Sequence, residues 1–324
     1  MNGKSKMKKI ISTLTAIMLS MLPFAAIAQT QTQTPVNITA VTNQGSPVQL
    51  TSFTSLNNSY TFNIQNTTNA QFCAGTDVCA LPTAQTGANA YTIANTRWGT
   101  YKLNNDNPGA CAPSITYGGS VYCLLEFHFH GPSEHWVNNS ATDLEVHYVF
   151  FKQSDASGSR GLCNSDSLVV MGQRIVGSGS SANAAWAATF NAIPAASSNG
   201  ANSSTLSLNI QTLMGIPAGN INAAPSYRYS GGLTAPISIA TLGGTQGNSC
   251  VSNSNPNNSY PWWGNPQRQL TQQAYPEIVQ WVLFRQPILV SVAQVNQFKT
   301  KFPDGNARSV QPNASTTIYL ANPN

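Results

Sequence analysis

The sequence predicts a mainly β chain that folds as one domain behind an N-terminal leader. Segments rich in Val, Ile, Tyr and Phe alternate with clusters of Gly, Asn, Ser and Pro, which is typical of strands bounded by turns. Only two stretches have the residue spacing of a helix. Charged residues make up only 8% of the chain, and Asn, Ser, Thr, Gly and Gln supply the polar surface. This composition suits a β-rich exported protein.

The apolar segments place the expected elements. We expect strands at 59–65, 122–130, 144–152, 167–176 and 278–286. The Ala-rich stretch 182–193 predicts one helix. A second helix is expected at 292–301, where Val292, Val295, Phe298 and Lys299 follow helical spacing. Two stretches with little periodicity, 70–112 and 243–274, are expected to be long loops.

The first 28 residues have the pattern of a signal peptide. Four lysines precede an apolar run at 10–27, and Ala26-Ile27-Ala28 fits a cleavage site before Gln29. The run is too short and wrongly flanked for a membrane span, although a retained N-terminal anchor is the alternative. We therefore expect a leader at 1–28, a single domain at 29–324, and no membrane span once the leader is removed.

The charge of the chain argues against a nucleic-acid partner. The full sequence has 15 basic and 10 acidic residues. Because the leader holds four lysines and no acid, the remaining chain has 11 basic and 10 acidic residues, a net charge of +1. A nucleic-acid surface needs clustered Lys and Arg. The apparent basicity is therefore a targeting feature.

Six cysteines in an exported chain suggest up to three disulfides. Fifteen pairings are possible for six cysteines, and the sequence does not choose among them. The hypothesis adopted here pairs near neighbours and leaves one long-range bridge: Cys73–Cys79, Cys111–Cys123 and Cys163–Cys250. Free thiols are the alternative.

All four histidines of the chain lie between residues 128 and 147. Strand side chains alternate between two faces, so Glu126, His128 and His130 share one face of their strand, and Phe127 and Phe129 share the other. In the next expected strand, Glu145, His147 and Val149 share a face. If the two strands are antiparallel neighbours, the three histidines meet.

Three imidazoles with one open position are the pattern of a catalytic zinc site, since a structural site has a fourth protein ligand. We therefore predict Zn²⁺ held by His128, His130 and His147. Glu126 and Glu145 stand where an outer carboxylate accepts the ligand N–H bonds and fixes the imidazole tautomers. His135 has no strand context and is interpreted as a hydrogen-bonded structural residue.

These motifs resemble those of the α-class carbonic anhydrases. The run Glu126-Phe-His-Phe-His130, then Pro-Ser-Glu-His135, then Leu-Glu145-Val-His147 carries the resemblance. Further matches run from about residue 45 to 320; they are Gly45-Ser-Pro-Val48, Val169-Val-Met-Gly172, Tyr229-Ser-Gly-Gly-Leu233-Thr234-Ala-Pro236, Val279-Gln-Trp281-Val-Leu, Gln286-Pro-Ile288 and Asn306-Ala-Arg-Ser-Val-Gln-Pro312.

The resemblance implies a large, mostly antiparallel, twisted central β-sheet with short peripheral helices. It also implies reversible hydration of CO2 to bicarbonate by zinc-bound hydroxide, that is, a carbonate dehydratase, a carbon–oxygen lyase. Thr234 would orient the hydroxide and pass its proton to Glu134, and Tyr229 would join that network. The resemblance further implies an apolar CO2 pocket; its residues would be Val149, Val170, Leu233, Val279 and Trp281.

Three positions depart from the family pattern. Tyr60 stands at the family's proton-shuttle histidine, and a phenol with its ordinary pKa of about 10 exchanges protons poorly at neutral pH. We therefore expect turnover limited by proton export and partly rescued by imidazole. Ala235 replaces a threonine of the substrate site and alters anion contacts. Glu126 replaces a glutamine, which makes the bonded imidazole more electron-rich.

An active lyase is the principal hypothesis, since every residue that metal–hydroxide chemistry needs is present. The alternative is a carbonic-anhydrase-like binding or surface protein with weak or no catalysis. The expected partner is a small molecule, CO2 or bicarbonate. The leader predicts a periplasmic or secreted protein. The family includes monomers and dimers, so a homodimer is possible.

Overall fold

The computed structural model describes the chain in segments. They are residues 34–39, 43–44, 50–54, 58–67, 100–107, 110–156, 168–179, 181–193, 200–216, 224–232, 234, 279–303, 305–307, 310 and 317–322. Within these segments strands predominate and helices are short, as the composition predicts.

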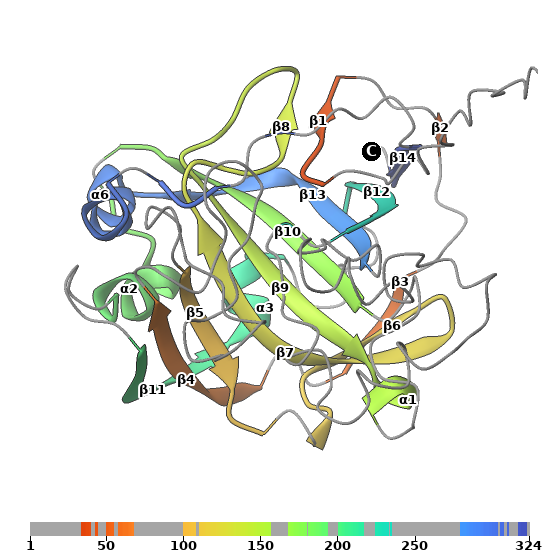
Figure 1. Cartoon of the computed structure of the whole chain (residues 1–324), viewed down its shortest axis with the longest axis horizontal. Coiled ribbons are helices and arrows are strands. Elements are labelled where there is room, and N and C mark those ends of the chain that lie inside the picture. Colours follow the sequence, from red (N-terminus) through yellow and green to blue (C-terminus); the bar gives the residue numbers. More distant parts are fainter. Residues whose placement is uncertain are drawn as a thin grey trace, which may run out of the picture. The chain divides into compact units, whose positions relative to one another are not determined.

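One sheet of 12 strands contains nearly all of the described strands (Figure 1). Ten follow one another across it in the order β11 (Gly200–Asn209), β4 (Ser59–Thr67), β5 (Thr100–Asn105), β7 (Ser120–His130), β9 (Leu144–Lys152), β10 (Leu168–Gly177), β13 (Val279–Val290), β12 (Ser226–Gly231), β14 (Tyr319–Ala321) and β2 (Asn43–Gln44). Off this path, β6 (Ser114–Tyr117) pairs with β7 and with β3 (Leu50–Thr54). A separate pair joins β1 (Asn37–Ile38) to β8 (Trp136–Val137).

Most neighbouring strands of the large sheet are antiparallel. The exceptions within it are the parallel pairs β10–β13 and β14–β2. The expected mostly antiparallel sheet is therefore confirmed. Its centre is formed by β7, β9, β10 and β13, which lie side by side (Figure 1).

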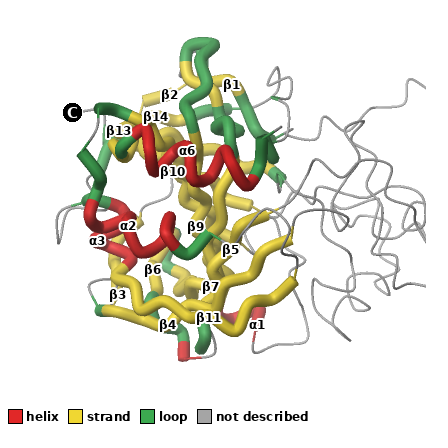
Figure 2. Tube along the Cα trace, turned by 90° about the vertical axis from the view of Figure 1, so that its left-hand side faces the viewer, coloured by secondary structure: helices red, strands yellow, loops and turns green. Residues whose placement is uncertain are grey.

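Four short helices are described: α1 (Gln153–Ala156), α2 (Ala184–Asn191), α3 (Ile210–Met214) and α6 (Val292–Lys301). Helix α6 begins with a capping box, in which the Ser291 hydroxyl accepts the Gln294 N–H and the Gln294 side chain accepts the Ser291 N–H. The predicted second helix matches α6 at both ends. Its buried residues include Val295 and Phe298, whereas Val292 is exposed. Helices α2, α3 and α6 lie close together beside the sheet (Figure 2).

The two faces of the sheet bury separate apolar clusters. One cluster, here called the aromatic core, contains Phe127, Phe129 and Tyr148 together with residues of α2, α3 and α6. The other, here called the valine cluster, contains Val149, Val170 and Trp281. Strand residues therefore alternate between the two clusters, as period two requires.

The predicted loop at 70–112 is wrong in part, because residues 100–105 form strand β5. Tyr101 and Leu103 of β5 are fully buried and alternate with partly exposed Lys102 and Asn104. The strand pairs with β4 on one side and β7 on the other, so its neighbours fix its conformation despite its polar sequence. The remainder of this stretch up to residue 99 and all of 243–274 lie outside the described residues.

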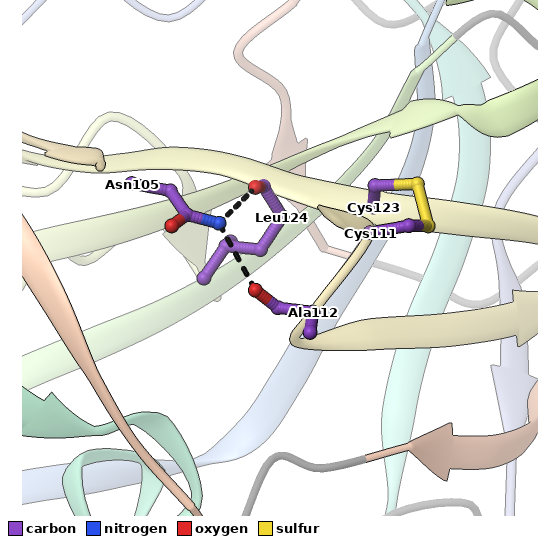
Figure 3. Close-up of a disulfide and its surroundings, with 5 residues drawn as sticks. All are labelled: Asn105, Cys111, Ala112, Cys123 and Leu124. Atoms are coloured by element: carbon purple, nitrogen blue, oxygen red, sulfur yellow. Dashed lines mark hydrogen bonds between the residues drawn. A yellow bond between two sulfur atoms is a disulfide. The ribbon is translucent and has the colours of Figure 1, made fainter. Parts of the chain in front are cut away.

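The predicted disulfide Cys111–Cys123 is present. It links the segment before β6 to strand β7 (Figure 3). Beside it, the Asn105 amide donates to the carbonyl oxygens of Ala112 and Leu124, at 3.2 and 2.9 Å. The bond to Leu124 fastens β7 two residues before Glu126. The other two predicted pairings, and the leader at 1–28, lie outside the described residues.

Candidate metal centre

Strands β7 and β9 bring the three predicted ligands to one face of the sheet. The strands are antiparallel neighbours in which His128 lies opposite His147, and His130 lies opposite Glu145. Glu126 lies opposite Val149. The predicted pairing and the predicted faces are both confirmed.

The three imidazoles are close enough to share one ion. Their ring centroids are 4.9 Å apart for His128 and His130, 5.3 Å for His128 and His147, and 4.6 Å for His130 and His147. One nitrogen of each ring lies within 4.8 Å of the others. His130 and His147 are buried, and the side chain of His128 keeps 16% of its surface exposed. The cluster is therefore open to solvent on the His128 side.

In each ring, one nitrogen faces a hydrogen-bond partner, and the other nitrogen faces the cluster. Nδ1 of His128 lies 2.9 and 3.0 Å from the two carboxylate oxygens of Glu126. Nε2 of His147 lies 3.0 Å from Oε1 of Glu145. A carboxylate only accepts hydrogen bonds, so these contacts place the ring protons on the outer nitrogens. The lone pairs of the inner nitrogens then point to the cluster.

His130 gives the clearest evidence that the cluster fits a cation. Its Nδ1 faces the backbone carbonyl oxygen of Asn306 at 3.5 Å. Its Nε2 is buried and has no hydrogen-bond partner among the described residues. A buried ring nitrogen without a partner is costly, and coordination of a metal ion would satisfy it.

Burial keeps two of the imidazoles neutral. Burial lowers the pKa of His147 to about 4, although the nearby Glu145 carboxylate acts in the opposite direction. Burial and the neighbouring imidazoles lower the pKa of His130 well below its usual value. Burial raises the pKa of Glu145, but His135 and His147 outweigh that effect and hold it well below its usual range. Neutral imidazoles beside an ionised carboxylate are the protonation states that a divalent cation requires.

His135 is a structural residue, as predicted. It is fully buried, its Nδ1 lies 2.7 Å from Oε1 of Glu145, and its backbone N–H donates to Oε2 of Glu145 at 2.8 Å. Its Nε2 forms a short hydrogen bond with the hydroxyl of Tyr229. His135, Glu145 and His147 also lie close enough together to be considered a metal site. Oε1 of Glu145 is already at hydrogen-bond distance from both rings, so these contacts account for their proximity.

Glu134 lies against the ligands, and Thr234 is buried like it. Oε1 of Glu134 is 3.2 Å from Nδ1 of His130, and its Oε2 is 4.0 Å from Nδ1 of His147. The predicted network linked Tyr229 to Thr234 and Glu134. In the structure the Tyr229 hydroxyl contacts His135, a residue that this prediction did not include. The proton exchange between Thr234 and Glu134 stays a prediction.

Four of the predicted pocket residues gather in the valine cluster. Val170 lies opposite Val149 on one side and Trp281 on the other, and Val279 belongs to the same cluster. The Trp281 ring centroid is 4.9 Å from that of His147, and its indole N–H donates to the Gly232 carbonyl oxygen. An apolar wall therefore adjoins the histidines. Leu233 and Ala235 lie outside the described residues.

Tyr60 does not lie on the face of the sheet that carries the histidines. It lies on β4, two strands away from β7, and its partly exposed ring packs against the aromatic core on the other face of the sheet. Its predicted place in the path of the proton stays a prediction.

Two residues near the ligands were not assigned a role from the sequence. Asn306 faces His130 with its backbone carbonyl, and its side-chain amide bonds the main chain at Phe129 and Gly131. Gly172 lies opposite His147, and a Cβ there would come within 2.9 Å of Oε1 of Glu145 and of the Leu283 side chain. The absence of a side chain at Gly172 therefore makes room for Glu145. The only sequence signal was a glycine inside an apolar strand, which indicates a close approach.

The comparisons with known proteins agree with this geometry. The family model described as eukaryotic-type carbonic anhydrase matches residues 83–239. The fold resembles that of the α-carbonic anhydrase from Thermovibrio ammonificans, solved with the inhibitor sulfanilamide, with a TM-score of 0.52 and 19% identity over 89% of this chain and 86% of that one. It also resembles carbonic anhydrase Cah3 from Chlamydomonas reinhardtii, solved with acetazolamide, with a TM-score of 0.54 and 19% identity over 90% and 92%.

No curated protein matches the sequence. Among the described residues, no helix has both the length and the apolar character needed to cross a membrane.

Proposed function

The chain is a member of the α-carbonic anhydrase family, the carbonate dehydratases, and on this premise we propose that it is an active, zinc-dependent enzyme. The family and the fold support CO2 hydration in general. The proposal goes further in three respects: the metal is zinc, the site is functional, and named residues of this chain hold the metal and move the proton.

The donor set favours zinc. Three neutral imidazoles with no fourth protein ligand are typical of a catalytic zinc centre. We assign Nε2 of His128, Nε2 of His130 and Nδ1 of His147 as the ligand atoms, because the opposite nitrogens already face Glu126, Asn306 and Glu145. Zinc would supply a Lewis acid, and carbonic anhydrase is itself the standard example of an enzyme in which zinc lowers the pKa of water to about 7.

The outer partners orient the ligands. The carboxylates of Glu126 and Glu145 fix the tautomers of His128 and His147, which keeps an unprotonated nitrogen directed at the cluster. The negative charge of these carboxylates also favours a cation in the cluster. Rigid orientation matters because a ring that turns away loses its contact with the metal.

The buried hydroxyl of Thr234 and the buried carboxylate of Glu134 would control the proton of the attacking water. An ionised Glu134 would accept a hydrogen bond from the Thr234 hydroxyl, and the Thr234 oxygen would then accept a hydrogen bond from the nucleophile. This arrangement would point the lone pair of the nucleophile at CO2. It needs no charge change at Thr234.

The valine cluster would hold the substrate. CO2 is small and apolar, so it gains nothing from polar groups and prefers the wall formed by Val149, Val170 and Trp281. The same wall excludes surplus water from the face beside His147. Leu233, Ala235 and Val279 complete the substrate site in this proposal.

The observation that carries the proposal is the antiparallel pairing of His128 with His147, which gathers three imidazoles beside an apolar wall. The test measures zinc content and stopped-flow CO2 hydration of the purified protein. We expect about one zinc per chain. His128→Ala should lose zinc and activity together, whereas Val121→Ala, at an exposed position on the same strand, should keep both.

The alternative of a weakly active or inactive binding protein makes a different prediction in the same assay. Protein that carries one zinc per chain but hydrates CO2 no faster than buffer would contradict the proposed activity. Normal hydration by His128→Ala would contradict the ligand assignment.

We further propose that the protein is exported, either to the periplasm or out of the cell, after cleavage before Gln29. The disulfide Cys111–Cys123 supports an oxidising compartment. N-terminal sequencing of the exported protein tests the cleavage, and a chain that still begins at Met1 would contradict it. The family includes monomers and dimers, and light scattering of the purified protein distinguishes a monomer from a homodimer.

A further inference from the structure

The strand beside β7 brings a lysine to the face of the sheet that carries the histidines. In β5, Tyr101 and Leu103 are fully buried in the aromatic core, whereas Lys102 between them is partly exposed. Lys102 lies directly opposite His128 in the antiparallel pairing of β5 with β7. Directly opposite residues of neighbouring strands share a face. Lys102 therefore stands beside a predicted ligand, on the side where the cluster is open to solvent.

The Lys102 ammonium acts on the carboxylate of Glu126. Glu126 precedes His128 by two positions, so it is the diagonal neighbour of Lys102, at about 7–8 Å and within reach of a long side chain. Both oxygens of this carboxylate lie close to Nδ1 of His128, at 2.9 and 3.0 Å. Burial raises the pKa of Glu126, but the His128 ring and the Lys102 ammonium together lower it below its usual value. Lys102 and Glu126 thus form a charge pair beside one ligand.

Without this lysine, the metal centre would be rich in negative charge. Glu126 and Glu145 each face a ligand ring, Glu134 lies against His130, and all three acidic side chains are buried. Carboxylates attract a cation to the cluster, but they repel an anion from the position that the three imidazoles leave open. Bicarbonate, which a carbonate dehydratase forms and consumes, is a monovalent anion. A positive charge beside Glu126 removes part of that repulsion.

We propose that Lys102 is a positioning residue that acts through Glu126: its ammonium offsets the negative charge of Glu126 and so strengthens the binding of monovalent anions, bicarbonate among them, at the open position. This inference rests on the proposed metal centre. Lys102 need not touch the anion, because a unit charge about 8 Å away in a partly hydrated site changes the affinity of an anion by about twofold to tenfold. The same charge must weaken the binding of a cation.

The first test measures the affinity for an anion. Thiocyanate is titrated into the full-length, cobalt-substituted protein at low ionic strength, and the visible absorption of the cobalt reports binding. We expect Lys102→Met to weaken thiocyanate binding about twofold to tenfold, and added inert salt to reduce this difference. Lys102→Arg keeps the charge and should bind as the wild-type protein does. Lys152→Met, at a partly exposed lysine at the far end of β9, is the matched control and should have no effect.

The second test measures the affinity for a cation. In competition with a chelator, Lys102→Met should bind zinc at least twofold more tightly than the wild-type protein, because it has lost a positive charge near the ligands. A variant that merely disturbed the fold would bind both zinc and thiocyanate more weakly. The double variant Lys102→Met/Glu126→Gln loses one charge of each sign, so its affinity for thiocyanate should return to within about twofold of the wild-type value.

The outcomes separate this proposal from the proposed function. A metal-loaded, active Lys102→Met protein with unchanged or tighter thiocyanate binding would overturn the role of Lys102 alone. Weaker binding of both zinc and thiocyanate would also overturn it, because Lys102 would then act on the fold. Wild-type protein that takes up no metal would overturn the proposed function and this inference with it.

Discussion

Asn306 holds the main chain on both sides of His130, although 176 positions separate the two residues along the sequence. The Asn306 amide donates to the carbonyl oxygen of Phe129 at 2.9 Å and accepts from the N–H of Gly131 at 2.8 Å, and its backbone carbonyl faces the His130 ring. A segment near the C-terminus therefore positions a ligand in the middle of the chain.

Replacing Asn306 should weaken both the fold and the metal site. Asn306→Ala removes two buried hydrogen bonds and leaves their backbone partners unsatisfied, so we expect a loss of about 2–4 kcal/mol in the free energy of unfolding. Urea unfolding measures this loss, and competition with a chelator measures zinc affinity. Asn191→Ala, at an exposed site on α2, is the control. Zinc affinity that stays unchanged in Asn306→Ala would show that His130 is positioned by other contacts.

Glu145 should matter more to zinc affinity than Glu126. Oε1 of Glu145 lies at hydrogen-bond distance from both His135 and His147, whereas Glu126 contacts His128 at the more open end of the site. Glu145→Gln puts an N–H donor or a weaker acceptor where two ring protons point, so we expect zinc affinity to fall about 10- to 100-fold. Glu126→Gln should cost less than Glu145→Gln. The reverse order in a chelator competition assay would contradict this view of the site.

Gly172→Ala tests how closely β10 approaches the ligands. The added methyl group would lie 2.9 Å from both Oε1 of Glu145 and Cδ1 of Leu283, so one of them must move. We expect a loss of about 1–3 kcal/mol in stability together with weaker zinc binding. Gly179→Ala is the control, because a Cβ there meets nothing within 4 Å and the residue is remote from the ligands. That variant should lose some stability through its positive φ of 67° but keep its zinc affinity.

The ion pair between Asp143 and Lys299 predicts a pH-dependent contribution to stability. Burial raises the pKa of the Asp143 carboxyl, but hydrogen bonds from the Lys299 ammonium and the Gly177 N–H outweigh it and hold the pKa below its usual range. A depressed carboxyl pKa stabilises the fold above the pKa of the unfolded state, about 3.9, and this contribution is lost as the pH falls through the folded value.

Asp143→Asn should therefore lower stability at pH 7 by about 1 kcal/mol or less, because both side chains are partly exposed and solvent screens the pair. The difference from the wild-type protein should shrink toward zero as the pH approaches 3. Lys299→Met should show a similar loss at pH 7. Urea unfolding across this pH range is the measurement, and a loss that does not change with pH would show that the carboxylate charge is not its cause.

Tyr60→His tests whether residue 60 takes part in proton export, as the family resemblance implies. An imidazole with an ordinary pKa of about 6.5 exchanges protons readily at neutral pH. On the hypothesis that residue 60 relays the proton, kcat should rise about tenfold or more in dilute buffer, and the gain should disappear in high concentrations of imidazole, which then carries the proton for both proteins. An unchanged kcat would show that residue 60 stays packed against the aromatic core, away from the path of the proton. Tyr60→Phe should match the wild-type enzyme. A slower Tyr60→Phe would show that the hydroxyl of Tyr60 takes part in turnover.

The sequence predicts the centre of the molecule well and its edges poorly. The period-two pattern around His128 and His147 locates β7 and β9 and their faces, because side chains alternate between the two faces of a strand and here the histidines share one face while the aromatic residues share the other. Helix α6 is equally visible, since it combines a Ser291 cap with 10 residues at helical spacing.

The remaining elements depend on their neighbours. Strand β11 is rich in Ser and Asn and becomes a strand by pairing with β4. Helix α3 has an Asn209 N-cap and ends at Gly215 in the left-handed conformation, but five residues are too few to display a period. The contact of the Asn306 carbonyl with His130 leaves no trace in residue types, because every residue has a carbonyl.

The two attachments of strand β7 have a consequence for metal exchange. The disulfide attaches the strand at Cys123, and the Asn306 side chain forms hydrogen bonds with the main chain at Phe129 and Gly131. His128 and His130 lie between these points. The disulfide and these hydrogen bonds therefore hold the strand on both sides of His128 and His130. The fold itself therefore sets the positions of these two imidazoles, and we expect binding of a metal ion to need no refolding of β7.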